Sequence, residues 1–236
     1  MQISAHFPVN CLKKGLEYVD FPFILAQYWR LKTYRETLLR FQNTFAIVDN
    51  GVSETGQPIH PDKVADILNQ GGAWKGILPD TIHRPIKSWS DTIRFVQSRG
   101  VDLKPWGMVL HGTNPEHIRF QHDLAVALGV GLICFPYRSP RASYLSTNHV
   151  AFQFDQRYHL MGLSEEDPLE SYSTLPGRWS IDTNKIWKVD LSKPGWHGHQ
   201  MNKEHYNVDF GLVKANVQYL KGRLHARPTG SIHPGT

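Results

Sequence analysis

Cysteine is scarce in this chain of 236 residues, which contains only Cys11 and Cys134, far apart in the sequence. Two cysteines exclude both a framework of several disulfides and a four-cysteine zinc site. Such sparse use of cysteine is typical of proteins from a reducing compartment. Cys134 lies within an apolar run, so we expect it to be a core residue.

Long hydrophobic runs are absent as well. No apolar stretch approaches the roughly 20 residues of a membrane-spanning helix, and residues 1–6 lack the basic and apolar regions of a signal peptide. We therefore expect a cytoplasmic protein with no membrane partner. The sequence also has no G-x-G-x-x-G after its first predicted strand, which argues against a dinucleotide-binding fold.

Basic residues outnumber acidic ones. The formal net charge is +5, and 13 histidines add positive charge as the pH falls. This balance favours anionic partners, nucleic acid above all, although it says nothing about the fold. Aromatic residues make up 11% of the chain, which excludes disorder as its global state.

Short apolar strands alternate with helical patterns along most of the chain. The predicted strands are 2–7, 44–49, 75–79, 106–110, 131–136, 158–161 and 179–181. The predicted helices are 61–70, a helix capped by Ser88 or Ser90 and ended by Gly100, and 115–128, which Asn114 caps and Gly129 ends.

Strands and helices that alternate every 25–30 residues or so indicate βα units and a parallel sheet. We expect a compact (β/α)8 barrel, complete or with an incomplete last unit, over residues 1–192; such barrels typically have about 250 residues. An open doubly wound sheet is the second choice. Residues 193–236 are predicted to form an irregular basic extension with one helix, near 213–220, packed on the barrel.

Three aspartates follow predicted strands: Asp49, Asp80 and Asp182. Because chemistry in parallel α/β folds collects at the carboxyl ends of the strands, we expect them to share one rim. Each also has a structural interpretation, as a turn residue or a helix cap. Like charges in one pocket shift each other's pKa values, which suits a nucleophile working beside an acid/base.

Six segments around these strand ends resemble the tRNA-guanine transglycosylase superfamily, in its order and spacing. The closest resemblance is to the reduced, phage-type members that place 7-deazaguanines such as preQ0 in DNA. The likeness covers roughly residues 44–184. The segments are 47–51 (Ile-Val-Asp-Asn-Gly), 78–80 (Leu-Pro-Asp), 109–112 (Val-Leu-His-Gly), 131–137, 159–162 (His-Leu-Met-Gly) and 180–182 (Ser-Ile-Asp).

The resemblance implies a role for each matching residue. Asp182 would be the nucleophile at C1′ of a guanosine, and Asp49 the general acid/base for the departing and entering bases. Asp80 would read the guanine-like edge, and Met161 would stack on the base. We expect the other base contacts to come from Asn50, His111, Gly112, Phe135 and Tyr137, and we expect no cofactor or metal.

The chain departs from the family at several of these positions. His111 stands where the family has glutamine, and Phe135-Pro136 replace a pair of glycines. Ser53 occupies the place of an expected aromatic residue, so that Tyr137 or Phe135 would supply the second stacking face. The zinc-binding cysteines are missing, and with them the zinc subdomain, which favours DNA over tRNA as the substrate.

The sequence therefore predicts a glycosyltransferase that exchanges guanine in DNA for a free 7-deazaguanine base. Action on tRNA and a non-catalytic nucleic-acid-binding barrel are the alternatives. Arg138, Arg141 and Arg157 are candidate phosphate contacts, or plain surface charges. His197 and His199 are expected to be surface histidines without a metal. A homodimer and partner modification proteins both stay open, and a phage origin would place the protein in a host cytoplasm.

Overall fold

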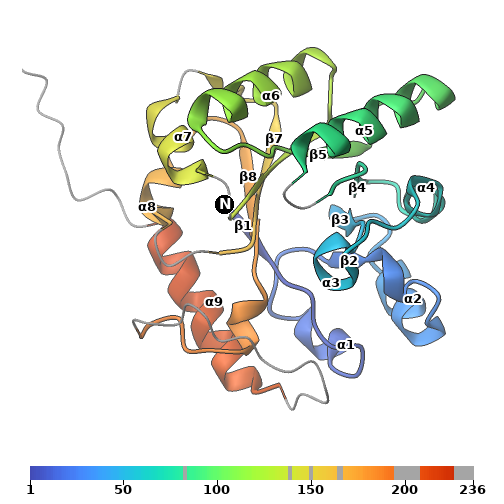
Figure 1. Ribbon diagram of the computed structural model, residues 1–236. Helices are drawn as coiled ribbons and strands as arrows, with labels where there is room; N and C mark the ends of the chain where they lie inside the picture. The colour runs from blue at the N-terminus through green and yellow to red at the C-terminus, as the bar shows by residue number, and fades with distance from the viewer. Residues whose placement is uncertain (82–83, 138–139, 149–150, 164–166, 194–207, 226–236) are drawn as a thin grey trace, which may run out of the picture.

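The computed structural model describes residues 1–236 except 82–83, 138–139, 149–150, 164–166, 194–207 and 226–236. Eight parallel strands form a nearly closed (β/α)8 barrel (Figure 1). The strands are β1 (Gln2–Ser4), β2 (Phe23–Leu25), β3 (Ala46–Asp49), β4 (Trp74–Ile77), β5 (Trp106–Val109), β6 (Leu132–Pro136), β7 (Arg157–Met161) and β8 (Arg178–Asp182).

The seam of the barrel lies between β1 and β2, which are the two ends of the strand order β1-β8-β7-β6-β5-β4-β3-β2. The segment before β2 closes this seam. The Asp20 N–H donates to Ile3 O (2.8 Å), and the Ile3 N–H donates back to Asp20 Oδ2 (2.8 Å). Ser4 Oγ donates to Phe21 O (2.7 Å). These bonds hold β1 where a strand ladder would hold it in a fully closed barrel.

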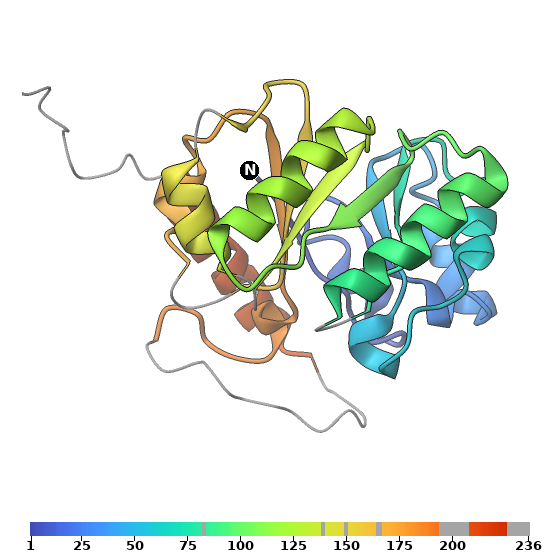
Figure 2. The same ribbon diagram turned by 45° about the horizontal axis from the view of Figure 1, so that its top comes forward.

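Helices surround the strands as an outer ring (Figures 1 and 2). They are α1 (Leu12–Gly15), α2 (Lys32–Leu39), α3 (Val52–Thr55), α4 (Pro61–Leu68), α5 (Pro85–Arg99), α6 (Pro115–Ala127), α7 (Arg141–Thr147), α8 (Leu169–Tyr172) and α9 (Phe210–His225), with the 3-10 turns η1 (Ala26–Tyr28) and η3 (Asn184–Trp187). Within the described residues, no helix is long and apolar enough to cross a membrane.

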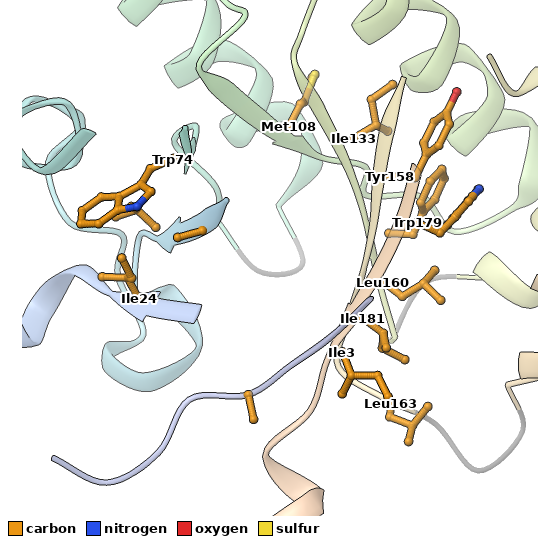
Figure 3. Close-up of a cluster of buried hydrophobic side chains, with 14 of the residues drawn as sticks. Ile3, Ile24, Trp74, Met108, Ile133, Tyr158, Leu160, Leu163, Trp179 and Ile181 are labelled. Atoms are coloured by element: carbon orange, nitrogen blue, oxygen red, sulfur yellow. The ribbon is translucent and has the colours of Figure 1, made fainter. Parts of the chain in front are cut away.

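Two hydrophobic clusters pack against the strands, one on each side of the sheet. On β6, Leu132 and Cys134 belong to the small cluster inside the barrel, whereas Ile133 and Phe135 belong to the large one between strands and helices. In the outer layer of β7 and β8, the rings of Tyr158 and Trp179 stack with centroids 4.7 Å apart (Figure 3). This alternation decides which residues near the strand ends can reach the mouth of the barrel.

All the strands predicted from the sequence are present, with ends shifted by a few residues, and the predicted barrel fold is confirmed. The Asn114 side chain caps α6 as predicted, since its Oδ1 accepts from the His117 N–H at 2.9 Å. The sequence analysis missed β2, which has three residues and lies between Pro22 and η1. Phe23-Ile24-Leu25 is a continuous apolar run, and periodicity alone cannot distinguish such a run from a segment of buried helix.

The predicted cap of α5 is wrong. The helix begins at Pro85, so Ser88 lies within it. The Ser88 hydroxyl instead accepts from the Thr81 N–H at 2.7 Å and contacts Asp80 Oδ1 at 3.4 Å. Ser88 thus ties the first turns of α5 to the end of β4.

The last unit of the barrel is complete. Strand β8 leads through η3 to α9, which contacts both η3 and α8. Val213, Val217 and Leu220 of α9 are buried in the same outer cluster as the strands. The helix predicted near 213–220 is therefore the outer helix of the eighth βα unit.

A buried histidine makes the fold sensitive to acid. Burial lowers the pKa of His122 from 6.5 to about 4, and its ring lies among Phe135, Phe152 and Tyr158. Below pH 6.5 this histidine becomes protonated in the unfolded chain, whereas in the folded chain it stays neutral down to about pH 4. The free energy of unfolding should therefore fall between these pH values, by about 3 kcal/mol for this histidine.

The measurement is urea unfolding at several pH values between 4 and 6.5, on the wild type and on His122→Gln. The variant should lose less stability toward acid than the wild type does. His117→Gln, at an exposed histidine, is the control and should follow the wild-type slope. Equal slopes in the wild type and His122→Gln would show that His122 does not carry this sensitivity.

Candidate active site

Every strand of the barrel delivers a polar or sulfur-bearing side chain to its carboxyl end, or to the residues that follow it. Catalytic groups of (β/α)8 enzymes come from this end. In strand order from β1 to β8, these mouth residues are His6, Gln27, Asp49, Asp80, His111, Tyr137, Met161 and Asp182. Three of them are the aspartates that the sequence placed on one rim.

Asp182 is held by one of its carboxylate oxygens. The Gly162 N–H donates to Asp182 Oδ1 at 3.0 Å, and His159 Nε2 lies 3.0 Å from the same oxygen. Gly162 has φ +71°, a conformation that favours glycine. Within the described part of the chain, Oδ2 makes no hydrogen bond, and the side chain is 13% exposed. One oxygen is fixed and the other is free.

His159 stands behind Asp182 inside the barrel. Its ring is fully buried and stacks on Phe23 with centroids 5.8 Å apart. Its Nδ1 lies 2.9 Å from Ser180 Oγ. The Ser180 hydroxyl donates to Tyr158 O at 3.2 Å, and its Oγ can accept from Nδ1–H. The His159 ring therefore bridges two residues of β8, Ser180 and Asp182.

The sequence analysis gave His159 no role of its own, although it belongs to the His-Leu-Met-Gly segment. The feature that could have identified His159 is its position on β7, two residues before Met161. Residues two apart on a strand share a face, so a side chain two residues before a mouth residue faces the barrel interior.

Asp49 is shaped by a tight turn. The Gly51 N–H donates to Asp49 Oδ2 at 3.0 Å, and Gly51 has φ +75°. The neighbouring Asn50 is buried, with Nδ2 donating to Leu78 O (3.0 Å) and Oδ1 accepting from the Val52 N–H (3.1 Å). Asn50 therefore joins β3 to the end of β4.

Asp80 and His111 are neighbours. His111 Nε2 contacts Asp80 Oδ1, and both side chains are largely buried. The amide of Gln121 fixes the His111 backbone, accepting its N–H at 2.8 Å and donating to its carbonyl. Gly112 is required next to it, because a Cβ there would lie 2.7 Å from Ile118 Cγ1. His111 thus orients Asp80 from the side of β5.

The charges of the three carboxylates all influence one buried group, the thiol of Cys134 beneath the mouth of the barrel. Burial, followed by the negative charges of Asp182, Asp49 and Asp80, raises the pKa of the Cys134 thiol. Cys134 is fully buried, as predicted for a core residue. The charge of Asp182 also raises the pKa of His6. Burial has the larger, opposite effect and lowers that pKa to about 4. The three aspartates therefore gather around one end of the barrel.

Two apolar surfaces flank the aspartates. Met161 packs against the inner cluster at the end of β7, and its carbonyl accepts from the Tyr137 N–H at 3.0 Å. Tyr137 is 44% exposed, and its ring lies against Gly162, where a Cβ would approach Cδ1 to 2.8 Å. A thioether and an aromatic ring are thus available beside Asp182.

Phe135 does not belong to the mouth, and the prediction that it contacts a base is wrong. Its side chain is fully buried in the outer layer, stacked on Tyr144 and on Trp179. The alternation along β6 explains this, because Cys134 takes the inward position.

The prediction that Arg141 contacts nucleic acid is also wrong. It is 1% exposed and forms a buried ion pair with Asp167. Its remaining N–H groups donate to the carbonyls of Phe135 (3.0 Å), Met161 (3.1 Å) and Gly162 (2.9 Å). Arg141 braces the ends of β6 and β7 and has no N–H group left for a phosphate.

Arg157 lies at the wrong end of the barrel for the predicted contact. It begins β7, whereas the mouth residues end the strands, and its guanidinium sits 4.3 Å from the centre of the Phe45 ring. Arg138, His197 and His199 lie outside the described residues. Among the residues described, no group of three or more His, Cys, Asp or Glu side chains could hold a metal ion.

No protein-family model and no curated protein matches the chain. Among solved structures, it is similar to a monomeric form of the dimeric phosphoribosylanthranilate isomerase from Thermotoga maritima. The TM-score is 0.50, with 13% sequence identity, over 94% of this chain and 99% of that one. At this identity the likeness concerns the fold alone. The chain is therefore a (β/α)8 barrel with three aspartates at the carboxyl ends of its strands.

Proposed function

We propose that this protein is a base-exchange transglycosylase that replaces guanine in DNA with a 7-deazaguanine base through a covalent aspartyl-sugar intermediate. The observation that carries the proposal is the half-anchored carboxylate of Asp182. Gly162 and His159 fix Oδ1, which leaves Oδ2 free to attack. A carboxylate held in this way loses little rotational freedom when it reacts.

In the first half-reaction, Asp182 Oδ2 attacks C1′ of the target guanosine. The C1′–N9 bond breaks, its electron pair goes to N9, and Asp49 supplies a proton to the departing guanine. Such a substitution passes through an oxocarbenium-like centre, as glycoside hydrolysis does. The covalent intermediate divides one difficult displacement into two easier ones.

The second half-reaction reverses the first with a new base. Asp49 takes the N9 proton of the incoming 7-deazaguanine, N9 attacks C1′, and the ester bond to Asp182 breaks. The Asp182 carboxylate and the Asp49 proton are both restored, so the exchange consumes no cofactor. One acid/base that serves both directions follows from microscopic reversibility.

Asp80 and the two apolar surfaces would hold the base. Asp80 can accept hydrogen bonds from N1–H and the exocyclic amine of guanine, while His111 and Ser88 contact its other oxygen, Oδ1. Met161 and Tyr137 offer faces on which a base can stack. Extruding a base from duplex DNA costs a few kcal/mol, which stacking of this kind partly offsets.

DNA is preferred to tRNA because the chain has only two cysteines and therefore no zinc site of the kind found in the tRNA enzymes. The test is nucleoside mass spectrometry of DNA and tRNA from cells that express the protein and are supplied with preQ0. A 7-deazaguanine nucleoside should accumulate in DNA and not in tRNA. Cells that express Asp182→Asn are the control.

Two results would contradict the proposal. Modified tRNA with unmodified DNA would move the activity to the tRNA substrate. Unmodified DNA and tRNA, with the protein expressed and folded, would favour a barrel that binds nucleic acid without catalysis.

A further inference from the structure

Polar atoms without partners accompany the three aspartates. Among the described residues, buried side-chain N or O atoms that lack a hydrogen-bond partner occur in Gln27, Thr81, His122 and Asn184. Thr81 follows Asp80 directly, and Asn184 is two residues beyond Asp182. Gln27 contacts the turn that shapes Asp49, as described next. Only His122 lies away from the mouth, in the outer layer.

Gln27 is the most incomplete of these residues, because both Oε1 and Nε2 are buried without a partner. It lies in η1, directly after β2, and its amide packs on the backbone of Gly51. A Cβ at Gly51 would lie 2.3 Å from Gln27 Oε1, so the turn can approach the amide only because residue 51 is glycine. The amide therefore sits beside the turn that holds Asp49.

An unpaired buried amide is costly. Leaving a buried donor or acceptor without a partner costs the full desolvation of that group, and native proteins contain few such groups. An apolar side chain of the same shape would avoid the cost at this position. The amide is therefore best explained by a partner that arrives with a ligand.

We propose that Gln27 binds the sugar edge of the guanine base, with Nε2–H donating to N3 and Oε1 accepting from the exocyclic amine. This inference rests on the proposed function. The amide presents a donor and an acceptor side by side, and the sugar edge of guanine presents the matching acceptor and donor. Asp80 takes N1–H and the other amine proton, so the two side chains share the exocyclic amine without competing for a hydrogen.

Both bases of the exchange carry this edge, because a 7-deazaguanine differs from guanine only at position 7 and its substituent. Gln27 would therefore serve the outgoing and the incoming base alike. The N3 edge is adjacent to N9, the atom on which Asp49 acts, and Gln27 touches the Asp49 turn. The proposal thus makes Gln27 a specificity residue that selects bases with an acceptor at position 3.

The test compares the binding of free guanine with that of 3-deazaguanine, which has C–H in place of N3, by calorimetric titration. The wild type should bind guanine about 10- to 100-fold more tightly. Gln27→Met keeps the length of the side chain and removes its polar atoms, so the preference should disappear. The same variant should melt about 2–4 °C higher than the wild type without ligand, because it removes the unpaired amide.

Gln121→Met is the matched control for stability. Both Oε1 and Nε2 of Gln121 are hydrogen-bonded to the His111 backbone, so the loss of this amide should lower the melting temperature. Should Gln27→Met fail to fold, Gln27→Asn withdraws the amide by one methylene group and should likewise lose the preference for guanine.

Two failures can be told apart. If the wild type binds guanine and forms the covalent adduct with DNA, but shows no preference over 3-deazaguanine or keeps it in the Gln27 variants, the role of Gln27 is refuted and the proposed function stands. If the wild type binds neither base and forms no adduct, the proposed function itself is refuted.

Discussion

The Asp182→Asn protein should fold like the wild type, form no covalent adduct with guanine-containing DNA and show no turnover. Asparagine has the shape of aspartate, its Oδ1 can still accept from the Gly162 N–H, and its side chain stays beside His159 Nε2. The free atom of the carboxylate, however, becomes an amide nitrogen, which is neutral and a poor nucleophile. Trapping on denaturing gels measures the adduct, and thermal melting verifies the fold.

Asp49→Asn provides the contrast within the same site. It leaves the nucleophile intact but removes the proton source for N9, and general acid–base help is typically worth about 10²- to 10⁴-fold in rate. A slow adduct should therefore form with this variant. An adduct formed by Asp182→Asn would mean that another residue is the nucleophile and that residues 180–182 are wrongly aligned with the family.

Replacing Arg141 with methionine should lower the free energy of unfolding by about 3–5 kcal/mol, the usual cost of removing one partner of a buried ion pair. The change leaves the buried Asp167 carboxylate without its cation. It also removes the Arg141 hydrogen bonds to the carbonyls of Phe135, Met161 and Gly162. Because the Gly162 N–H anchors Asp182, activity should fall as well. Urea unfolding measures the change in stability.

Arg223→Met is the matched control. Arg223 also forms a two-bond ion pair, with Glu170, but both side chains are 31% exposed. Exposed pairs contribute about 0–1 kcal/mol, so this variant should stay near wild-type stability. The double variant Arg141→Met/Asp167→Leu should regain part of the loss, because it removes the stranded charge. An Arg141→Met protein as stable as Arg223→Met would show that the buried pair is not essential.

The barrel could be predicted because its signals are local. Short, largely apolar segments of three to six residues mark β3 to β8, and Asn114 with Pro115 marks the start of α6. Gly100 and Gly129, with φ of +56° and +70°, end helices for a reason that depends on these residues alone. The three aspartates were predictable for the same reason, since they follow recognisable strands.

Some parts of the site could not be predicted because they depend on which way a side chain faces. Phe135 and Cys134 are adjacent in sequence, yet one lies in the outer layer and the other inside the barrel. Arg141 and Arg157 look alike as basic residues near strands. The fold buries the first against Asp167 and places the second at the opposite end of the barrel from the aspartates.

The sequence by itself determined the order of strands β3 to β8 and the positions of Asp49, Asp80 and Asp182 at the strand ends, because hydrophobic period, caps and turns are properties of neighbouring residues. Only the tertiary structure decided which groups surround those aspartates. His159 reaches Asp182 from a neighbouring strand, and Gln27 reaches the Asp49 turn from η1, which follows β2, the strand that the sequence analysis missed. Such contacts join residues that are distant in the chain, and they exist only once the parallel strands have closed around the core.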